Sequence, residues 1–237
     1  MSLLELQSVS KRFGGLTANQ DVSFSLDKGQ IVGLIGPNGA GKTTLFNCVA
    51  GYFPPTEGSI TLAGKTISGL APEACARAGV GRTFQIARTF HSMTAAENVL
   101  TGALLRERKV PKARDNAMQW LAFVGLERFA DKPSGSMTIS EQRRLAVARA
   151  LALEPQLLLM DEVMAGLNPS EVRETVDVVL KIRDKGIACL IVEHVLEGIM
   201  PIADKIVVLD RGRKIAEGTP AEVSSDPTVI HAYLGDE

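Results

Sequence analysis

The sequence contains few residues of the kinds that mark several large classes of protein. Only three of its 237 residues are cysteine, namely Cys48, Cys75 and Cys189. They are too few and too widely spaced for a disulfide framework or a zinc site, so a reducing cytoplasm fits best. Basic and acidic side chains nearly cancel, at 26 and 27, which argues against a general affinity for nucleic acid or anionic membranes.

Long apolar segments are also lacking. No stretch supplies the roughly 18 to 20 uncharged apolar residues that cross a bilayer. Glu5 follows the first four residues at once, with no basic or sustained apolar segment, so we expect no secretory signal. If the protein acts at a membrane, another chain must hold it there. The composition, 45% hydrophobic and 22% charged, predicts a folded domain with a substantial core.

Strand patterns occupy the first part of the chain. Apolar and polar residues alternate from Leu3 to Val9 and again from Val22 to Leu26, which predicts half-buried antiparallel strands. The segment from Ile31 to Ile35 is nearly all apolar, as expected for a strand covered on both faces. Residues 59–67, after a double-proline turn, have the pattern of a hairpin.

The middle of the chain is predicted to be helical. Thr94 and Glu97 can form a capping box at the start of a helix. Two apolar stripes have helical spacing: Val99, Leu100, Ala103 and Leu104, then Met118, Leu121 and Ala122. Gly125, just past the second stripe, is typical of a helix end. We therefore expect a helical insertion over approximately residues 88–150.

Strand patterns resume in the last third of the chain. They cover Leu157 to Met160, Ala188 to Val192 and Ile206 to Leu209, and helix-length amphipathic segments separate them. Such alternation predicts a mostly parallel sheet covered by helices, which places the chain in the α/β class.

Residues 36–43 match the phosphate-binding pattern G-x-x-x-x-G-K-[ST]. The predicted nucleotide-binding residues are Gly36, Pro37, Asn38, Gly39, Ala40, Gly41, Lys42, Thr43 and Thr44. Between a buried strand and a helix, the backbone N–H groups of such a loop face an anion. Lys42 would reach the β and γ phosphates of ATP, and the Thr43 hydroxyl would hold Mg²⁺. The alternative is a glycine turn with an incidental lysine.

Asp161 and Glu162 follow an apolar strand directly. In phosphate-loop enzymes such a strand lies beside the loop, so Asp161 can engage Mg²⁺ through water and Glu162 can polarise the attacking water. The alternative is a solvated strand end that caps the next helix.

These motifs, in this order, resemble the ATP-binding subunits of ABC transporters over essentially the whole chain. Further support comes from Gln85 in the segment 81–85, the segment Ala165 to Asn168, and His194 after a buried strand. The resemblance implies one ABC ATPase domain over residues 1–237. Its fold would be a RecA-like, mostly parallel phosphate-loop core with an N-terminal antiparallel β-subdomain and an inserted helical subdomain.

The resemblance also implies roles for residues that carry little information alone. Gln85 would sense Mg²⁺ and the attacking water, and His194 would contact the γ-phosphate, so both join Lys42 and Glu162 as candidate catalytic residues. Phe13 would stack on adenine. The alternatives are that His194 is a structural histidine and that Phe13 is an aromatic residue of the core.

One motif departs from the family pattern. The segment Met137 to Glu141 stands where the family usually has Leu-Ser-Gly-Gly-Gln or a variant. Thr138 keeps a hydroxyl and can form a capping box with Glu141 at a helix start that, in the family, faces the γ-phosphate on the other subunit. Ser140 adds a side chain where backbone approaches phosphate, and Glu141 brings a negative charge there. The alternative is a helix cap with no role across the interface.

Several segments resemble the branched-chain amino acid importer branch, among them residues 81–85, 93–100, 161–169 and 232–235. This branch implies integral-membrane permease subunits, a second ATP-binding subunit, identical or related, and an external substrate-binding protein acting indirectly. The chain would work at the cytoplasmic face of the membrane, without nucleic acid. Urea import and lipopolysaccharide export remain open, as do a soluble ABC-type ATPase acting on ribosomes or DNA and a phosphate-loop kinase with a small acceptor.

Overall fold

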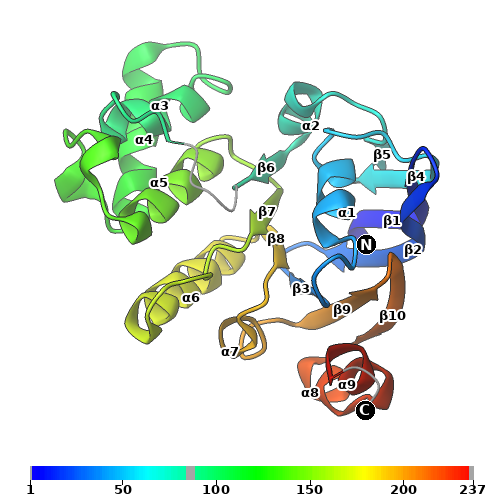
Figure 1. The fold of residues 1–237 in the computed structure, drawn as a ribbon. Helices are drawn as coiled ribbons and strands as arrows, with labels where there is room; N and C mark the ends of the chain where they lie inside the picture. The colour runs from blue at the N-terminus through cyan, green and yellow to red at the C-terminus, as the bar shows by residue number, and fades with distance from the viewer. Residues whose placement is uncertain (1, 84–88, 235–237) are drawn as a thin grey trace.

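The computed structural model describes residues 2–83 and 89–234, and within these ranges the chain forms two β-sheets and nine α-helices. Figure 1 shows the antiparallel sheet at one side of the molecule and the helices within residues 95–151 at the other. A mostly parallel sheet lies between them and carries the loop matched to the phosphate-binding pattern.

The antiparallel sheet has the strand order β2-β1-β4-β5. Its strands are β1 (Ser2–Phe13), β2 (Leu16–Asp27), β4 (Glu57–Leu62) and β5 (Lys65–Thr66). The alternating apolar side chains of β1 and β2 are buried, as the period of two predicted. The predicted hairpin is present as the antiparallel pair of β4 and β5.

The second sheet has the order β10-β9-β3-β8-β7-β6. Its strands are β3 (Ile31–Ile35), β6 (Val80–Arg82), β7 (Leu157–Asp161), β8 (Ala188–Val192), β9 (Lys205–Asp210) and β10 (Arg213–Gly218). Only β10 pairs antiparallel within this sheet of described strands. Every residue of β3, β7 and β8 is buried, which confirms the prediction of strands covered on both faces.

The strand that ends in Asp161 does not lie directly beside the strand that leads into the loop. Strand β8 stands between β3 and β7. Strand order depends on which crossovers the chain makes, and the local apolar pattern carries no such information. Because all three strands run parallel, their carboxyl ends still meet at one edge of the sheet.

Two hydrophobic clusters lie on opposite faces of the parallel sheet. Val32 and Leu34 of β3 belong to the cluster that contains α1 (Lys42–Val49) and the antiparallel sheet. Ile31 and Ile35 belong to the other cluster, together with α5 (Ile139–Leu151) and α6 (Pro169–Asp184). Shorter helices complete the chain: α2 (Pro72–Ala78), α7 (Leu196–Ile199), α8 (Pro220–Ser225) and α9 (Pro227–Leu234).

Between β6 and β7 the chain forms α3 (Ala95–Ala103), α4 (Val110–Phe123), α5 (Ile139–Leu151) and short 3₁₀ turns at Glu127–Phe129 and Ser134–Ser136. The Thr94 and Glu97 capping box is confirmed, with bonds of 3.2 and 2.8 Å. The second apolar stripe was partly wrong, because Ala113, Ala117 and Leu121 form the buried face of α4 and Ala122 is exposed. In the described part of the chain, no helix has the length and apolar character to cross a membrane.

Candidate nucleotide site

The predicted loop connects β3 to α1 through backbone conformations that favour glycine. Gly36 has φ +146° and Gly41 has φ +96°. A Cβ at Gly36 would overlap the carbonyl oxygen of Leu209, and one at Gly41 would overlap that of Ala18. The two glycines are therefore required by close backbone approach as well as by φ. This packing holds the loop against β9 and β2.

The start of α1 is arranged to receive an anion. Gly41 occupies its N-cap position, and no described side chain forms a capping hydrogen bond there. The N–H groups of a first helical turn have no partner within the helix, and the helix dipole adds a partial positive charge. The loop therefore presents unfilled donors to the space in front of it.

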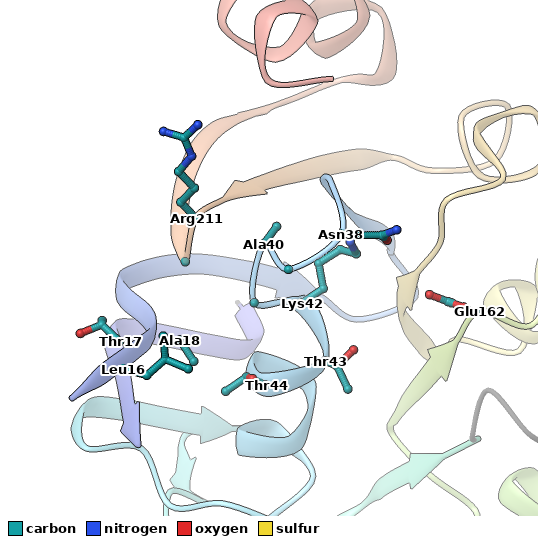
Figure 2. Close-up of a pocket in the computed structure, with 13 residues that line it drawn as sticks. Leu16, Thr17, Ala18, Asn38, Ala40, Lys42, Thr43, Thr44, Glu162 and Arg211 are labelled. Carbon is teal, nitrogen blue, oxygen red and sulfur yellow. The ribbon is translucent and has the colours of Figure 1, made fainter. Parts of the chain in front are cut away.

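That space is a pocket of about 550 Å³. Its lining comes from four segments: residues 16–18, residues 38–44, Glu162, and residues 211–212. Figure 2 shows Glu162 on one side of the loop, with Arg211 and Leu16 on the other. Lys42, Thr43 and Thr44 are thus brought together with Glu162, although more than a hundred residues separate them in the sequence.

Lys42 is held within the loop. Its Nζ donates hydrogen bonds to the carbonyl oxygens of Gly36 at 2.7 Å and Pro37 at 3.0 Å. Burial lowers the pKa of Lys42, while the charges of Glu162 and Asp161 oppose that shift. A phosphate would supply the negative charge that this buried ammonium group favours.

Asp161 and Glu162 differ in exposure. Asp161 is buried, and burial raises its pKa; the charge of Glu162 adds to this, while the guanidinium of Arg82 opposes it. Glu162 lines the pocket and has φ +49°, a left-handed conformation that costs a non-glycine residue of order 1–3 kcal/mol. Backbone strain of this kind is concentrated at functional sites, which agrees with the place of Glu162 in the pocket lining.

His194 lies next to Glu162, as the family resemblance implied for two residues at one reaction centre. Its Nδ1 is 3.6 Å from Oε1 of Glu162, and half of its side chain is exposed. His194 follows β8, the strand between β3 and β7. His194 therefore follows the strand whose neighbours lead into the loop on one side and into Glu162 on the other.

Glu193 is a buried residue that the sequence pattern alone did not single out. Its side chain is fully buried, and its Oε1 accepts a 2.7 Å hydrogen bond from the backbone N–H of Met164. Burial raises the pKa of Glu193, and backbone N–H groups of Met164, Val195 and His194 oppose the shift. The carboxylate ties the segment after β7 to the segment after β8. A carboxylate directly after the apolar run 187–192 was the available signal.

Phe13, predicted to stack on adenine, is not among the described residues that line the pocket. Phe13 packs edge-on against Phe53, with ring centroids 5.2 Å apart, and Lys11 lies over its ring. Leu16 and Arg211 line the pocket on the side of the loop opposite Glu162 (Figure 2). Both are exposed, and Leu16 begins β2 while Arg211 lies in the turn after β9, so no periodic pattern could have singled them out.

The motif that departs from the family pattern forms the start of α5. The Thr138 side chain accepts from the N–H of Glu141 at 3.2 Å, and the N–H of Thr138 donates to Oε2 of Glu141 at 2.8 Å, so the capping box is confirmed. Lys132 lies 3.3 Å from the same oxygen. Although burial raises the Glu141 pKa, the Thr138 N–H and Lys132 lower it overall. Ser140 is only 8% exposed.

Neither Thr138 nor Ser140 joins the pocket described above, because its lining residues come from other segments of the described chain. Gln85 lies outside the described residues. In the segment Ala165 to Asn168, Asn168 caps α6 by accepting from the N–H groups of Ser170 and Glu171 at 2.9 and 3.1 Å.

The residues at the loop fit Mg²⁺, which needs few protein ligands, better than a metal ion whose ligands all come from protein side chains. Among the described residues, no three His, Cys, Asp or Glu side chains are grouped so as to hold a metal ion. Thr43 supplies one hydroxyl and Asp161 one carboxylate. Mg²⁺ commonly takes one or two such ligands and completes its shell with water and phosphate oxygens.

Three features meet at one edge of the sheet: a buried strand, a glycine loop that leads into an uncapped helix start, and a carboxylate pair. Together they define a phosphate-loop nucleotide-binding protein. The chain belongs to the ABC transporter family, whose model matches residues 19–165. It is an ATP-hydrolysing nucleotide-binding cassette of that family. A second family model, the branched-chain amino acid ATP-binding cassette transporter, matches residues 213–237.

Individual proteins agree with this assignment. The chain is 41% identical to the high-affinity branched-chain amino acid transport ATP-binding protein BraF of Pseudomonas aeruginosa, over 99% of this chain and 98% of BraF. The ADP conformation of the cassette MJ1267 has 31% identity and a TM-score of 0.92, with all of both chains covered. A dimeric cassette, MJ0796 bound to ADP and phosphate, has 25% identity and a TM-score of 0.82, covering 92% and 98%. The predicted fold class and family resemblance are confirmed.

Proposed function

We propose that this cassette powers the uptake of branched-chain or other hydrophobic amino acids. The observation that carries the proposal is the match of residues 213–237 to the branched-chain amino acid cassette model, added to the near full-length similarity to BraF. The pocket itself holds nucleotide and gives no information about cargo, so the proposal rests on relatives rather than on site chemistry.

In the proposed mechanism, the protein positions ATP and neutralises its charge. Lys42 and the N–H groups at the start of α1 hold the phosphates. Thr43 and Asp161 would hold Mg²⁺, which would supply positive charge to neutralise the phosphate oxygens. Glu162 orients and polarises the attacking water. His194, whose Nδ1 lies 3.6 Å from Oε1 of Glu162, contacts the γ-phosphate. Gln85 completes the set as a sensor of water and metal.

The start of α5 is proposed to act on a second cassette. Thr138 and Ser140 lie outside the pocket of their own chain, which fits a head-to-tail dimer in which each α5 faces the nucleotide of its partner. The dimeric structure of the similar cassette MJ0796 supports pairing of two cassettes. When two cassettes close, the N–H groups at the start of each α5 would approach the nucleotide bound by the partner.

The helical insertion, approximately residues 88–150, is proposed to dock on integral-membrane permease subunits at the cytoplasmic face of the membrane. An open groove there is lined by Phe90, Gly102, Arg149 and Leu153, among others, and Phe90 is 50% exposed. Arg82, three residues before Gln85, also lines it. An external substrate-binding protein would deliver the amino acid to the permeases.

The test is uptake of leucine, isoleucine and valine by cells that carry Lys42→Ala at the native locus. We expect a large loss of uptake, because the substitution removes the buried ammonium group that would bind the phosphates. Lys65→Ala, which changes an exposed lysine of β5, is the matched control and should leave uptake intact. Unimpaired uptake of all three amino acids in Lys42→Ala cells without a parallel importer would contradict the proposed cargo. The cassette assignment would stand.

A further inference from the structure

Asp161 has a partner that the proposed mechanism does not use. Arg82, the last residue of β6, places Nη2 3.5 Å from Oδ2 of Asp161. The two side chains are only 11% and 9% exposed. Removing charges from water is costly unless they are paired, so this contact compensates the buried carboxylate when no metal is bound.

Arg82 is also held from a second direction. Its Nη1 donates a 2.7 Å hydrogen bond to Oδ1 of Asn47, a residue of α1. Its guanidinium lies over the rings of Tyr52 at 5.0 Å and Phe46 at 5.8 Å. The contact with Asn47 is shorter than the contact with Asp161. The guanidinium therefore keeps a hydrogen-bond acceptor and aromatic faces if Asp161 turns away.

Arg82 and Mg²⁺ make competing demands on one carboxylate. A carboxylate that engages Mg²⁺ through water directs its lone pairs and charge at the metal shell. A guanidinium against the same carboxylate withdraws an acceptor site and places a positive charge close to the divalent cation. Two cations sharing one buried carboxylate repel each other, so the better-bound cation displaces the other.

We propose that Arg82 is a positioning residue that holds Asp161 in the nucleotide-free protein and releases it to Mg²⁺, remaining bound to Asn47. This inference rests on the proposed role of Asp161 as a metal residue. It gives Arg82 two effects of opposite sign, stabilising the empty site and raising the Mg²⁺ concentration needed to load it.

The experiment measures binding of a fluorescent ATP analogue to the full chain at fixed nucleotide while free Mg²⁺ is varied. We expect Arg82→Gln to lower the Mg²⁺ midpoint about three- to tenfold, because the competing cation is gone. Arg82→Lys keeps the charge and should stay nearer the parent. In an Asp161→Asn background, Arg82→Gln should leave the midpoint unchanged, because the group for which the cations compete is absent.

A second variant acts in the opposite direction and leaves the buried pair intact. Asn47→Ala removes the alternative acceptor, so Arg82 should stay on Asp161 and the Mg²⁺ midpoint should rise. Thermal unfolding without nucleotide supplies an independent readout. Arg82→Gln should lower the melting temperature of the empty protein, and saturating Mg²⁺ and ATP should narrow the difference from the parent.

An unchanged or raised Mg²⁺ midpoint in Arg82→Gln, with Asp161 intact, would overturn the inference. So would a lowered midpoint in Asn47→Ala. A parent protein that binds nucleotide with no dependence on Mg²⁺, or a midpoint unaffected by Asp161→Asn, would remove the metal role of Asp161 and the inference with it. The first two outcomes would contradict the proposed role of Arg82, and the last two would contradict the metal role of Asp161.

Discussion

The molecule contains two helix N-termini that are candidates for phosphate contact, and they are built in opposite ways. Gly41 is the N-cap residue of α1, and no described side chain caps the helix. Thr138 is the N-cap residue of α5, where side chains satisfy both the Thr138 and Glu141 backbone N–H groups. One start offers free donors and a lysine, whereas the other is already capped and carries a carboxylate.

The difference separates binding of ATP from closure of a dimer. The start of α1 can bind phosphate within one chain, because its donors need no rearrangement. The start of α5 is stable alone, and a phosphate arriving from a partner must compete with the Glu141 carboxylate. We infer that tight nucleotide binding by one chain coexists with weak closure and slow basal hydrolysis.

The largest expected effect comes from a variant that retains phosphate binding and stops the chemistry. Glu162→Gln keeps the shape of the side chain and loses the carboxylate, so hydrolysis should fall about 100-fold or more. ATP binding should remain, and the ATP-bound dimer should accumulate. In that dimer the α1 start of one chain would lie near the α5 start of its partner. Steady-state hydrolysis at saturating ATP checks this. A rate within threefold of the parent would remove Glu162 from the role.

The next effect comes from closing the open start of α1. Gly41→Ala places a Cβ against the Ala18 carbonyl at a left-handed φ, so we expect about 2–4 kcal/mol of destabilisation and at least tenfold weaker ATP binding. Urea unfolding and equilibrium nucleotide binding measure the two effects.

Gly39→Ala is the matched control for that variant. Gly39 has φ +81°, yet a Cβ added there would have no described atom within 4 Å. The substitution should cost only the left-handed strain, about 1–2 kcal/mol. Equal losses in the two variants would show that φ, rather than the contact with β2, sets the requirement for glycine.

A smaller effect is expected from removing the charge at the start of α5. Glu141→Gln keeps a side chain that can complete the capping box but deletes the negative charge facing a partner's phosphate. In the Glu162→Gln background, the ATP-dependent dimer fraction should rise about two- to fivefold by size-exclusion chromatography. A lower fraction would show that Glu141 supports closure instead.

The same variant has a pH signature. Because the folded pKa of Glu141 lies below its ordinary value of 4.5, its stabilising contribution is present above that value and is lost as the pH falls through the folded pKa. At neutral pH, Glu141→Gln should cost about 0.5–1 kcal/mol. The stability difference from the parent should shrink below pH 4.5, measured by urea unfolding.

The smallest effect is expected from Ser140→Gly. Because Ser140 is only 8% exposed, the substitution removes little surface that a phosphate could meet. The dimer fraction or hydrolysis rate should rise by less than about twofold, while the helix loses roughly 0.5 kcal/mol of propensity. If both activities are unchanged or fall, either the motif is aligned wrongly or the α5 start makes no contact across the interface.

Features set by neighbours in the sequence could be predicted. The loop, the strand before it and the capping boxes at Thr94 and Thr138 depend on short-range patterns, and the structure contains all of them. The buried face of α4 was partly mispredicted because alanines form much of it, and alanine contributes a weak apolar signal.

Features set by distant pairs could not be predicted from the residues alone. Arg82 meets Asp161 across 79 positions, and Glu193 meets Met164 across 29. The ionic partner of a buried carboxylate depends on which strands are adjacent, and that order follows from crossovers that leave no local trace. Family resemblance supplied His194, because a histidine after a strand says little by itself.

The attachment of the loop to β9 and the turn after it has a consequence for synthesis. The N–H of Gly212 donates to the carbonyl oxygen of Ala40, and Ile31 at the start of β3 bonds the Asp204 carboxylate 173 positions away. The antiparallel sheet, by contrast, needs only the first 66 residues. A growing chain on the ribosome can therefore complete that sheet early, but it cannot hold ATP until residues near 212 have emerged.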